Sequence, residues 1–236
     1  MNSITFVSAK MTLPLSHTFS AIVSGPSRAG KSFWIQKLIS NKDEMIKPNI
    51  EKIIYCYSEW QALFDTYDKT LVNFHHGMID VDQLDKSKKN LLIIDDLISE
   101  IDSKMEDIFT KHSHHRNVSI IFITQNLFLK SRHMRTMSLN ASYLSLFKNP
   151  RDVNQVSFLA RQMFPPKEGK FLQEAYADAT EKPYGYLFID LKQETNERLR
   201  IRTGIFPDEL TYIYIPKSHM KSLQRYDSNG IHVNHE

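Results

Sequence analysis

This 236-residue chain has a single cysteine, no long apolar run and a small net charge. The lack of cysteine and the lack of a long apolar run each exclude a class of protein. The single cysteine, Cys56, cannot form a disulfide within the chain, so a disulfide scaffold is excluded and a reducing compartment is expected. Because Cys56 lies in the apolar stretch KIIYCYS, we expect a small buried core residue. No apolar run approaches the roughly 20 residues that span a bilayer, and residues 1–17 lack the regions of a secretory signal.

The charges nearly cancel. Thirty Lys and Arg residues face 27 Asp and Glu residues, which gives a formal net charge of +3, so any nucleic-acid binding must depend on local patches. Hydrophobic residues make up 41% and charged residues 24% of the chain, as in ordinary soluble globular proteins. The length suits one α/β domain.

Apolar periodicity predicts strands that alternate with helices. The expected strands are residues 18–24, 52–58, 71–75, 91–97, 118–124, 142–148, 184–191 and 198–206. The expected helices are residues 31–40, 59–67, 98–113, 151–164 and 170–180, and a basic linker covers residues 127–138. This alternation predicts an α/β fold whose central, largely parallel sheet is covered on both faces. We expect one domain at 18–215, an N-terminal extension at 1–17 and a flexible tail at 216–236.

Residues 25–32, GPSRAGKS, match the Walker A pattern G-x-x-x-x-G-K-[ST] between an expected strand and an expected helix. Backbone N–H groups of such a loop surround a phosphate, and the positive end of the following helix favours the anion. Lys31 is expected to reach the β- and γ-phosphates and Ser32 to ligate Mg²⁺. The alternative is a chance match in a glycine-containing turn. The expected nucleotide-binding residues are Gly25, Pro26, Ser27, Arg28, Ala29, Gly30, Lys31, Ser32 and Phe33.

The run LLIIDD ends in two carboxylates, Asp95 and Asp96, at the end of a strand where open α/β sheets bind ligands. Since alternation points them in different directions, we expect Asp95 to hold Mg²⁺ and Asp96 to polarise the attacking water, as in a Walker B motif. Aspartate is shorter than the glutamate common at the second position, which makes this base assignment less direct, and Glu100 is a weaker substitute. The alternative is a pair of carboxylates in a strand-end turn.

The expected strand at 118–124 is followed by Gln125. In a parallel sheet its polar end lies beside the phosphate site, so Gln125 is expected to bind the γ-phosphate or the attacking water. The alternative is an amide that caps the next helix.

Seven segments in this order resemble the viral genome-packaging ATPases of the FtsK–HerA superfamily, in particular the poxvirus-type ATPase of Polinton (Maverick) elements, adintoviruses and virophages. The segments are GPSRAGKS, IIYCYSEWQALFD, LLIIDDLISEI, FTKHSHHRNVSIIFITQNLF, LNASYLSLFKNPRD, LARQMFP and YLFIDLKQETNERLRIRTGIF, from about Phe19 to Phe206. The resemblance implies a P-loop NTPase fold, a RecA/ASCE-like three-layer sandwich. It also implies an ATP- and Mg²⁺-dependent motor that moves double-stranded DNA into a preformed capsid.

The same resemblance implies a homo-oligomeric ring of five or six subunits at a viral capsid vertex. It places the protein inside the host cell, in the nucleus or a cytoplasmic virus factory, with the virion as a further location. In such rings an arginine just before the strand that ends in the glutamine reaches a neighbour's ATP, and Arg116 matches that position. Arg151 is the reserve, and its alternative is a salt bridge at a helix start.

With Arg116 acting on a neighbour, the histidines beside it, in the stretch KHSHHR, are expected at a subunit interface, and they have two other interpretations. Zinc binding is disfavoured, because three ligands this close at a helix end form a poor tetrahedral site and no second cluster lies nearby. A polar helix end is the second interpretation.

Two basic clusters are candidates for contact with the DNA backbone, which needs no base-reading module. The first, in the linker after Gln125, comprises Lys130, Arg132, His133 and Arg135. The second, alternating along an expected strand, comprises Arg198, Arg200 and Arg202. For either cluster a solvated basic face is the alternative.

Three other functions compete with the packaging motor: another P-loop DNA translocase, a P-loop small-molecule kinase and a passive nucleotide-binding protein. A kinase needs an acceptor pocket and an arginine-rich lid, and it does not need the strand KIIYCYS between the phosphate loop and LLIIDD. The intact set of Lys31, Ser32, Asp95, Asp96 and Gln125 argues against a passive binder.

Overall fold

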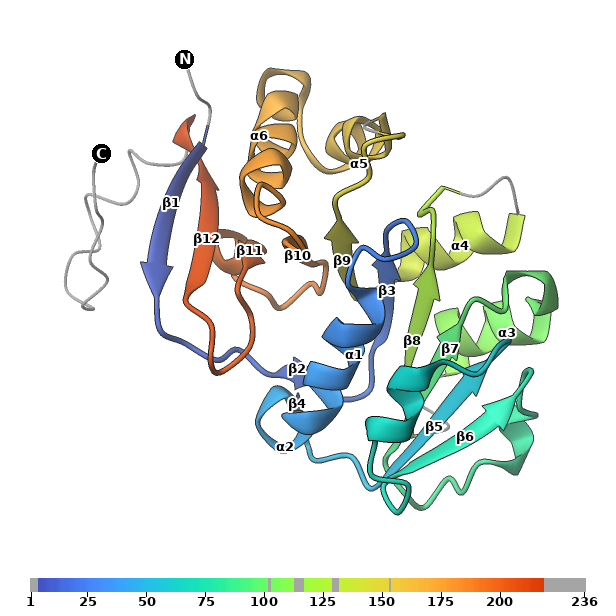
Figure 1. Ribbon diagram of the computed structural model, residues 1–236. Coiled ribbons are helices and arrows are strands. Elements are labelled where there is room, and N and C mark those ends of the chain that lie inside the picture. The colour runs from blue at the N-terminus through green and yellow to red at the C-terminus, as the bar shows by residue number, and fades with distance from the viewer. Residues whose placement is uncertain (1–3, 102, 113–116, 129–131, 153, 219–236) are drawn as a thin grey trace.

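The computed structural model of the protein describes residues 4–101, 103–112, 117–128, 132–152 and 154–218. Within these residues, ten strands form one sheet in the order β1-β12-β11-β10-β9-β3-β8-β7-β5-β6 (Figure 1). They are β1 (Ile4–Ala9), β3 (Ser20–Ser24), β5 (Lys52–Tyr57), β6 (Val72–His76), β7 (Asn90–Asp95), β8 (Val118–Thr124), β9 (Tyr143–Phe147), β10 (Tyr186–Asp190), β11 (Ile201–Thr203) and β12 (Thr211–Pro216). A second, two-stranded sheet pairs β2 (Leu15–Ser16) with β4 (Ile46–Lys47).

The strands from β9 to β6 are parallel, and the four strands from β10 to β1 are antiparallel. The central strand β7 is buried along its whole length, as its continuous apolar run predicts. In the parallel part, Ser24 pairs with Thr124 and Asp95 with Ile123. The carboxyl ends of β3, β7 and β8 therefore meet at one edge of the sheet.

Helices cover both faces of the sheet and complete a three-layer sandwich (Figure 1). One face packs against α1 (Lys31–Ser40), α2 (Lys42–Met45) and the 3-10 turn η1 (Ala62–Thr66). The other packs against α3 (Ser103–Asp107), α4 (Arg132–Asn140), α5 (Asn154–Met163) and α6 (Gly169–Ala179). Each fully buried aliphatic side chain of these two cores contributes roughly 1.5–3 kcal/mol. The expected α/β class and sandwich are confirmed.

Several expected elements differ from the structure, among them the expected helix at 59–67, where the structure has only the 3-10 turn η1. The expected basic linker contains a helix, α4, because Met134 and Met137 lie three residues apart and are both buried, while the arginines between and before them are exposed. The expected helix at 98–113 is instead a 3-10 turn η3 (Ile98–Glu100), the short α3 and a π-helical turn η4 (Ile108–His112). The remaining turns are η2 (Val81–Gln83), η5 (Pro166–Glu168) and η6 (Glu197–Leu199).

The expected N-terminal extension contains a strand of the main sheet. β1 pairs antiparallel with β12 along its full length, from Ile4 opposite Pro216 to Ala9 opposite Thr211. The sheet thus begins before the expected domain boundary at residue 18. In the described part of the chain, no helix combines the length and the apolar character that a membrane crossing requires.

Candidate nucleotide-binding site

The loop at residues 25–30 joins the buried strand β3 to α1, which begins at Lys31. Gly30, the N-cap of α1, has a φ of 104°, a conformation that favours glycine. Gly25 is needed for a different reason, since a Cβ there would lie 2.6 Å from the Cβ of Phe147 on β9. The strand, loop and helix thus have the arrangement that the Walker A pattern requires.

Lys31 folds back over its own loop. Its Nζ donates hydrogen bonds to the carbonyl oxygens of Gly25 at 2.6 Å and Pro26 at 2.9 Å. Burial lowers the pKa of the Lys31 ammonium, and attraction to Asp95 and Asp96 opposes that shift. The ammonium therefore lies between the phosphate loop and the two carboxylates.

Asp95, the last residue of β7, is almost fully buried, with 6% of its surface exposed. Burial raises the pKa of its carboxyl group, against the opposing effects of a hydrogen bond and of Lys31. The hydrogen bond comes from the hydroxyl of Tyr55 on β5, which donates to Asp95 Oδ2 at 2.8 Å. Sequence reasoning missed this tyrosine, because an aromatic residue inside an apolar strand resembles ordinary core.

Asp96 and Gln125 lie together at the mouth of the same edge. Asp96 has a φ of 56° and is exposed, and Nε2 of Gln125 donates to its Oδ2 at 3.5 Å. The left-handed backbone at Asp96 turns its carboxylate away from the direction of the Asp95 carboxylate, so the two acids have different surroundings.

A pocket of about 230 Å³ brings these groups together. It is lined by Ser27, Arg28, Lys31, Ser32, Gln61, Asp95, Asp96, Ile123, Thr124 and Gln125. Seven expected site residues thus share one pocket: Ser27, Arg28, Lys31, Ser32, Asp95, Asp96 and Gln125. Gln61, just before η1, was not expected; the Ser32 hydroxyl donates to its Oε1 at 3.5 Å. The only sequence signal for Gln61 was its place shortly after the strand at 52–58.

The donor set of this pocket suits Mg²⁺. Magnesium in phosphate sites usually takes one or two carboxylates together with phosphate oxygens and water. The Ser32 hydroxyl and the Asp95 carboxylate line the pocket together, with Asp96 beside them. Among the residues that the structure describes, no cluster of three or more His, Cys, Asp or Glu side chains could form a separate all-protein metal site.

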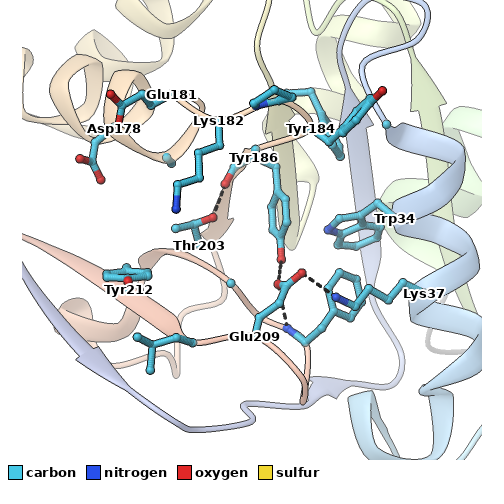
Figure 2. Close-up of a pocket in the computed structure, with 18 of the residues that line it drawn as sticks. Trp34, Lys37, Asp178, Glu181, Lys182, Tyr184, Tyr186, Thr203, Glu209 and Tyr212 are labelled. Atoms are coloured by element: carbon cyan, nitrogen blue, oxygen red, sulfur yellow. Dashed lines mark hydrogen bonds and ion pairs between the residues drawn. The ribbon is translucent and has the colours of Figure 1, made fainter.

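Two residues of the expected nucleotide-binding set, Gly30 and Phe33, line a second and larger cavity of about 650 Å³ (Figure 2). Nearly half of its lining residues are aromatic, and the wall comes from α1, β9, the end of α6, the turn at 181–185 and the strands β10 to β12 with their connections, together with Phe6 of β1. Tyr184 has a φ of 64°, is 70% exposed and packs against the loop: a Cβ on Gly30 would lie 3.1 Å from its ring. Phe33 is 62% exposed.

A polar network forms the floor of this cavity (Figure 2). Lys37 of α1 forms ion pairs with Glu209 at 2.7 Å and Asp208 at 2.9 Å, and the hydroxyl of Tyr186 donates to Glu209 at 2.7 Å. Burial lowers the pKa of the Lys37 ammonium, but its hydrogen bonds to Glu209 and Asp208 more than compensate, so that pKa is raised. The network ties α1 to the loop that precedes β12.

The candidate arginines have different surroundings. Arg116 and Lys130 lie outside the described residues, as do His114 and His115. Arg132 and Arg135 are exposed on α4, while His133 between them bonds to Glu106. Arg151 is exposed just before α5.

The expectation that Arg198, Arg200 and Arg202 share one strand face is wrong, because β11 contains only residues 201–203. Arg202 is 3% exposed and forms an ion pair with Asp190 at 3.5 Å. Arg200 is bound to Glu197 and donates to the carbonyl oxygen of Asp190 at 2.7 Å. These two cations stabilise the turn between β10 and β11 and do not form a DNA-facing row.

The sheet, the helices and the loop together have the P-loop NTPase fold. The phosphate loop follows β3, the paired carboxylates end β7, and β8 lies between these two strands. No protein-family model matches the chain, and no curated protein matches it.

Solved structures match this fold. The genome packaging NTPase B204 from Sulfolobus turreted icosahedral virus 2, in complex with sulfate, gives a TM-score of 0.52 at 14% identity over 79% of this chain and 95% of that chain. B204, the DNA-packaging ATPase from Sulfolobus turreted icosahedral virus, gives 0.49 at 13% identity over 78% and 96%. At 14% identity, the likeness to the B204 structure in complex with sulfate confirms the fold.

Proposed function

We propose that this protein is an ATPase that uses hydrolysis to move double-stranded DNA into a viral capsid. The observation that carries the proposal is the pocket shared by Lys31, Ser32, Asp95, Asp96 and Gln125 at the phosphate loop. The resemblance of the sequence to viral packaging ATPases supports the DNA-moving part, as does the fold that the chain shares with a genome packaging NTPase.

In this proposal the phosphates of ATP lie over the loop at 25–32. The Lys31 ammonium exchanges the carbonyl oxygens of Gly25 and Pro26 for phosphate oxygens and offsets the negative charge that develops during transfer. Ser32 and Asp95 would hold the Mg²⁺ of the nucleotide, which would supply positive charge against the phosphates. Asp96 accepts the proton of the attacking water, and Gln125, hydrogen-bonded to Asp96, orients that water. The products are ADP and inorganic phosphate.

The nucleoside part of ATP enters the larger cavity. Gly30 and Phe33 line that cavity and also belong to the phosphate loop and the helix that follows it, so one ligand reaches both pockets. The cavity volume of about 650 Å³ lies in the range of small-molecule sites. Exposed aromatic rings at Phe33 and Tyr184 offer stacking surfaces for a base.

Coupling to DNA passes through the segment after Gln125. That segment leads from the nucleotide pocket to α4, where Arg132 and Arg135 are exposed and can contact phosphates without reading bases. Arg116 acts in trans on a neighbour's ATP, within a ring of five or six subunits docked at a capsid vertex. The protein works inside the infected cell, in the nucleus or a cytoplasmic virus factory.

The test is the steady-state ATPase rate with and without long duplex DNA, with Lys31→Ala as the control. We expect duplex to stimulate hydrolysis and Lys31→Ala to abolish it. Absence of hydrolysis in a ring assembled on DNA would contradict the proposal. Transfer of phosphate to a small acceptor, independent of DNA, would identify a kinase.

A further inference from the structure

Tyr55 makes the only hydrogen bond that the structure gives to the Asp95 carboxylate among the described residues. The hydroxyl donates to Oδ2 at 2.8 Å, and both residues are buried, with Tyr55 0% and Asp95 6% exposed. Tyr55 is opposite Ile93 in the register of β5 and β7, so the two side chains start two residues apart on the same face. The long tyrosine ring spans that offset and reaches the carboxylate.

The ring of Tyr55 is held by other aromatic rings. Phe64 of η1 lies 4.9 Å away between ring centroids, Phe74 of β6 lies 5.5 Å away, and Tyr67 lies 6.2 Å away. A ring packed on several sides has little rotamer freedom, so its hydroxyl is a fixed donor. One oxygen of Asp95 is therefore held by a fixed hydrogen bond, which restricts the orientation of the carboxylate. The Asp95 side chain still lines the nucleotide pocket.

We infer that Tyr55 is a positioning residue that orients Asp95 as a ligand for the Mg²⁺ of the bound nucleotide. The inference rests on the proposed function, because it assigns Tyr55 a role toward the metal of that site. Partners that hydrogen-bond to a metal ligand typically change metal affinity by 10–100-fold when they are removed. Tyr55 does not line the nucleotide pocket, so it acts through Asp95.

Tyr55→Phe tests the inference, since it deletes the hydroxyl and keeps the packed ring. Tyr67→Phe is the matched control: Tyr67 belongs to the same aromatic cluster and is 7% exposed, and within the described residues its hydroxyl has no hydrogen-bond partner. The measurement is binding of the non-hydrolysable analogue AMPPCP to the full chain, by calorimetry, with Mg²⁺ titrated and then with EDTA.

We expect Tyr55→Phe to weaken the apparent Mg²⁺ affinity of the nucleotide complex about tenfold and to leave metal-free binding within about twofold. Tyr67→Phe should match the wild type in both conditions. An unchanged Mg²⁺ dependence in Tyr55→Phe would overturn the inference, and so would an equal loss of binding with and without Mg²⁺. A wild-type chain that binds no nucleotide in either condition would overturn the proposed function together with the inference.

Discussion

At the scale of single residues, the proposed function divides the nucleotide between a charged pocket for the phosphates and an aromatic cavity for the base. Lys31, Asp95 and Asp96 supply the charges around the smaller pocket, whereas Phe33 and Tyr184 are exposed rings on the larger cavity. The charged pocket and the aromatic cavity therefore contribute separately to binding, because a ligand without a base uses only the charged pocket.

Replacing Tyr184 by alanine is expected to weaken ATP binding about tenfold, since a base–aromatic stack contributes roughly 1–3 kcal/mol. Tripolyphosphate, which has no base, should bind the variant as it binds the wild type. Calorimetric titration with both ligands measures the difference. An equal loss for ATP and tripolyphosphate would show that Tyr184 acts through the loop at Gly30 and not through a base.

The residues that sequence reasoning predicted at this site carry strong local signals. The phosphate loop has a spacing pattern, and the carboxylates and Gln125 end expected strands, so topology alone brings them together. Tyr55 and Gln61 have no such signal. Tyr55 lies within a strand that reads as core, and its contact with Asp95 depends on the lateral pairing of β5 with β7.

At the scale of elements, ion pairs join segments that are far apart in the chain. Lys37 on α1 is bound to Asp208 and Glu209, which lie just before β12. The hydrogen bond from Lys37 holds the pKa of the Asp208 carboxyl below its usual range, while the pKa of Lys37 is raised. Asp208, whose pKa is lowered by folding, stabilises the fold at pH values above the pKa that it has in the unfolded chain. Lys37, whose pKa is raised by folding, stabilises the fold at pH values below the pKa that it has in the unfolded chain.

Lys37→Met is therefore expected to lower the free energy of unfolding by about 1 kcal/mol at pH 7, after allowance for the exposure of Asp208. The difference from the wild type should shrink as the pH falls below about 4, toward the lowered pKa of Asp208, and as it rises above about 10, toward the raised pKa of Lys37. Urea unfolding at pH 7 and at pH 3.5 measures it. Lys69→Met, which removes an exposed pair with Asp65, is the control and should change little. A difference independent of pH would assign the effect to packing of the lysine stem.

Arg202 provides a second test at this scale. It is buried beside Asp190 and lies over the ring of Phe188, 5.0 Å from the ring centroid. Removing one partner of a buried pair leaves an uncompensated charge, so Arg202→Met is expected to destabilise the protein by about 3 kcal/mol. Chemical denaturation gives the value. A variant of unchanged stability with weakened DNA binding would instead restore Arg202 as a DNA contact.

Elements built on weak patterns were the ones that sequence reasoning missed. β1 and β12 pair with each other at the edge of the sheet although they lie about 200 residues apart in the chain. The expected domain boundaries at residues 18 and 215 did not allow for this pairing. α4 was hidden because its buried positions are methionines between basic residues. By contrast, β7 and β8 are continuous apolar runs, and sequence reasoning predicted both.

At the scale of the whole molecule, the sheet is continuous from β1 to β6, with the phosphate site at the carboxyl ends of its central parallel strands. The larger cavity lies on the side of β9 and β10, and α4 follows β8. The larger cavity therefore borders the antiparallel strands, whereas the smaller pocket is lined by Gln125, which lies between β8 and α4 in the chain. The proposed coupling of hydrolysis to the position of DNA follows this order along the chain, from Gln125 to Arg132 and Arg135 of α4.

The most direct test of that coupling is displacement of a third strand from a DNA triplex by the protein assembled on the adjoining duplex. If the protein moves along DNA, we expect displacement of the third strand to require ATP. The displacement should be lost when AMPPCP replaces ATP and in the Lys31→Ala variant. Because phosphate contacts are ionic and screened by salt, Arg132→Ala with Arg135→Ala should slow displacement most at low salt, and the difference from the wild type should shrink as salt rises. Duplex-stimulated hydrolysis by the assembled protein without any displacement would contradict the account.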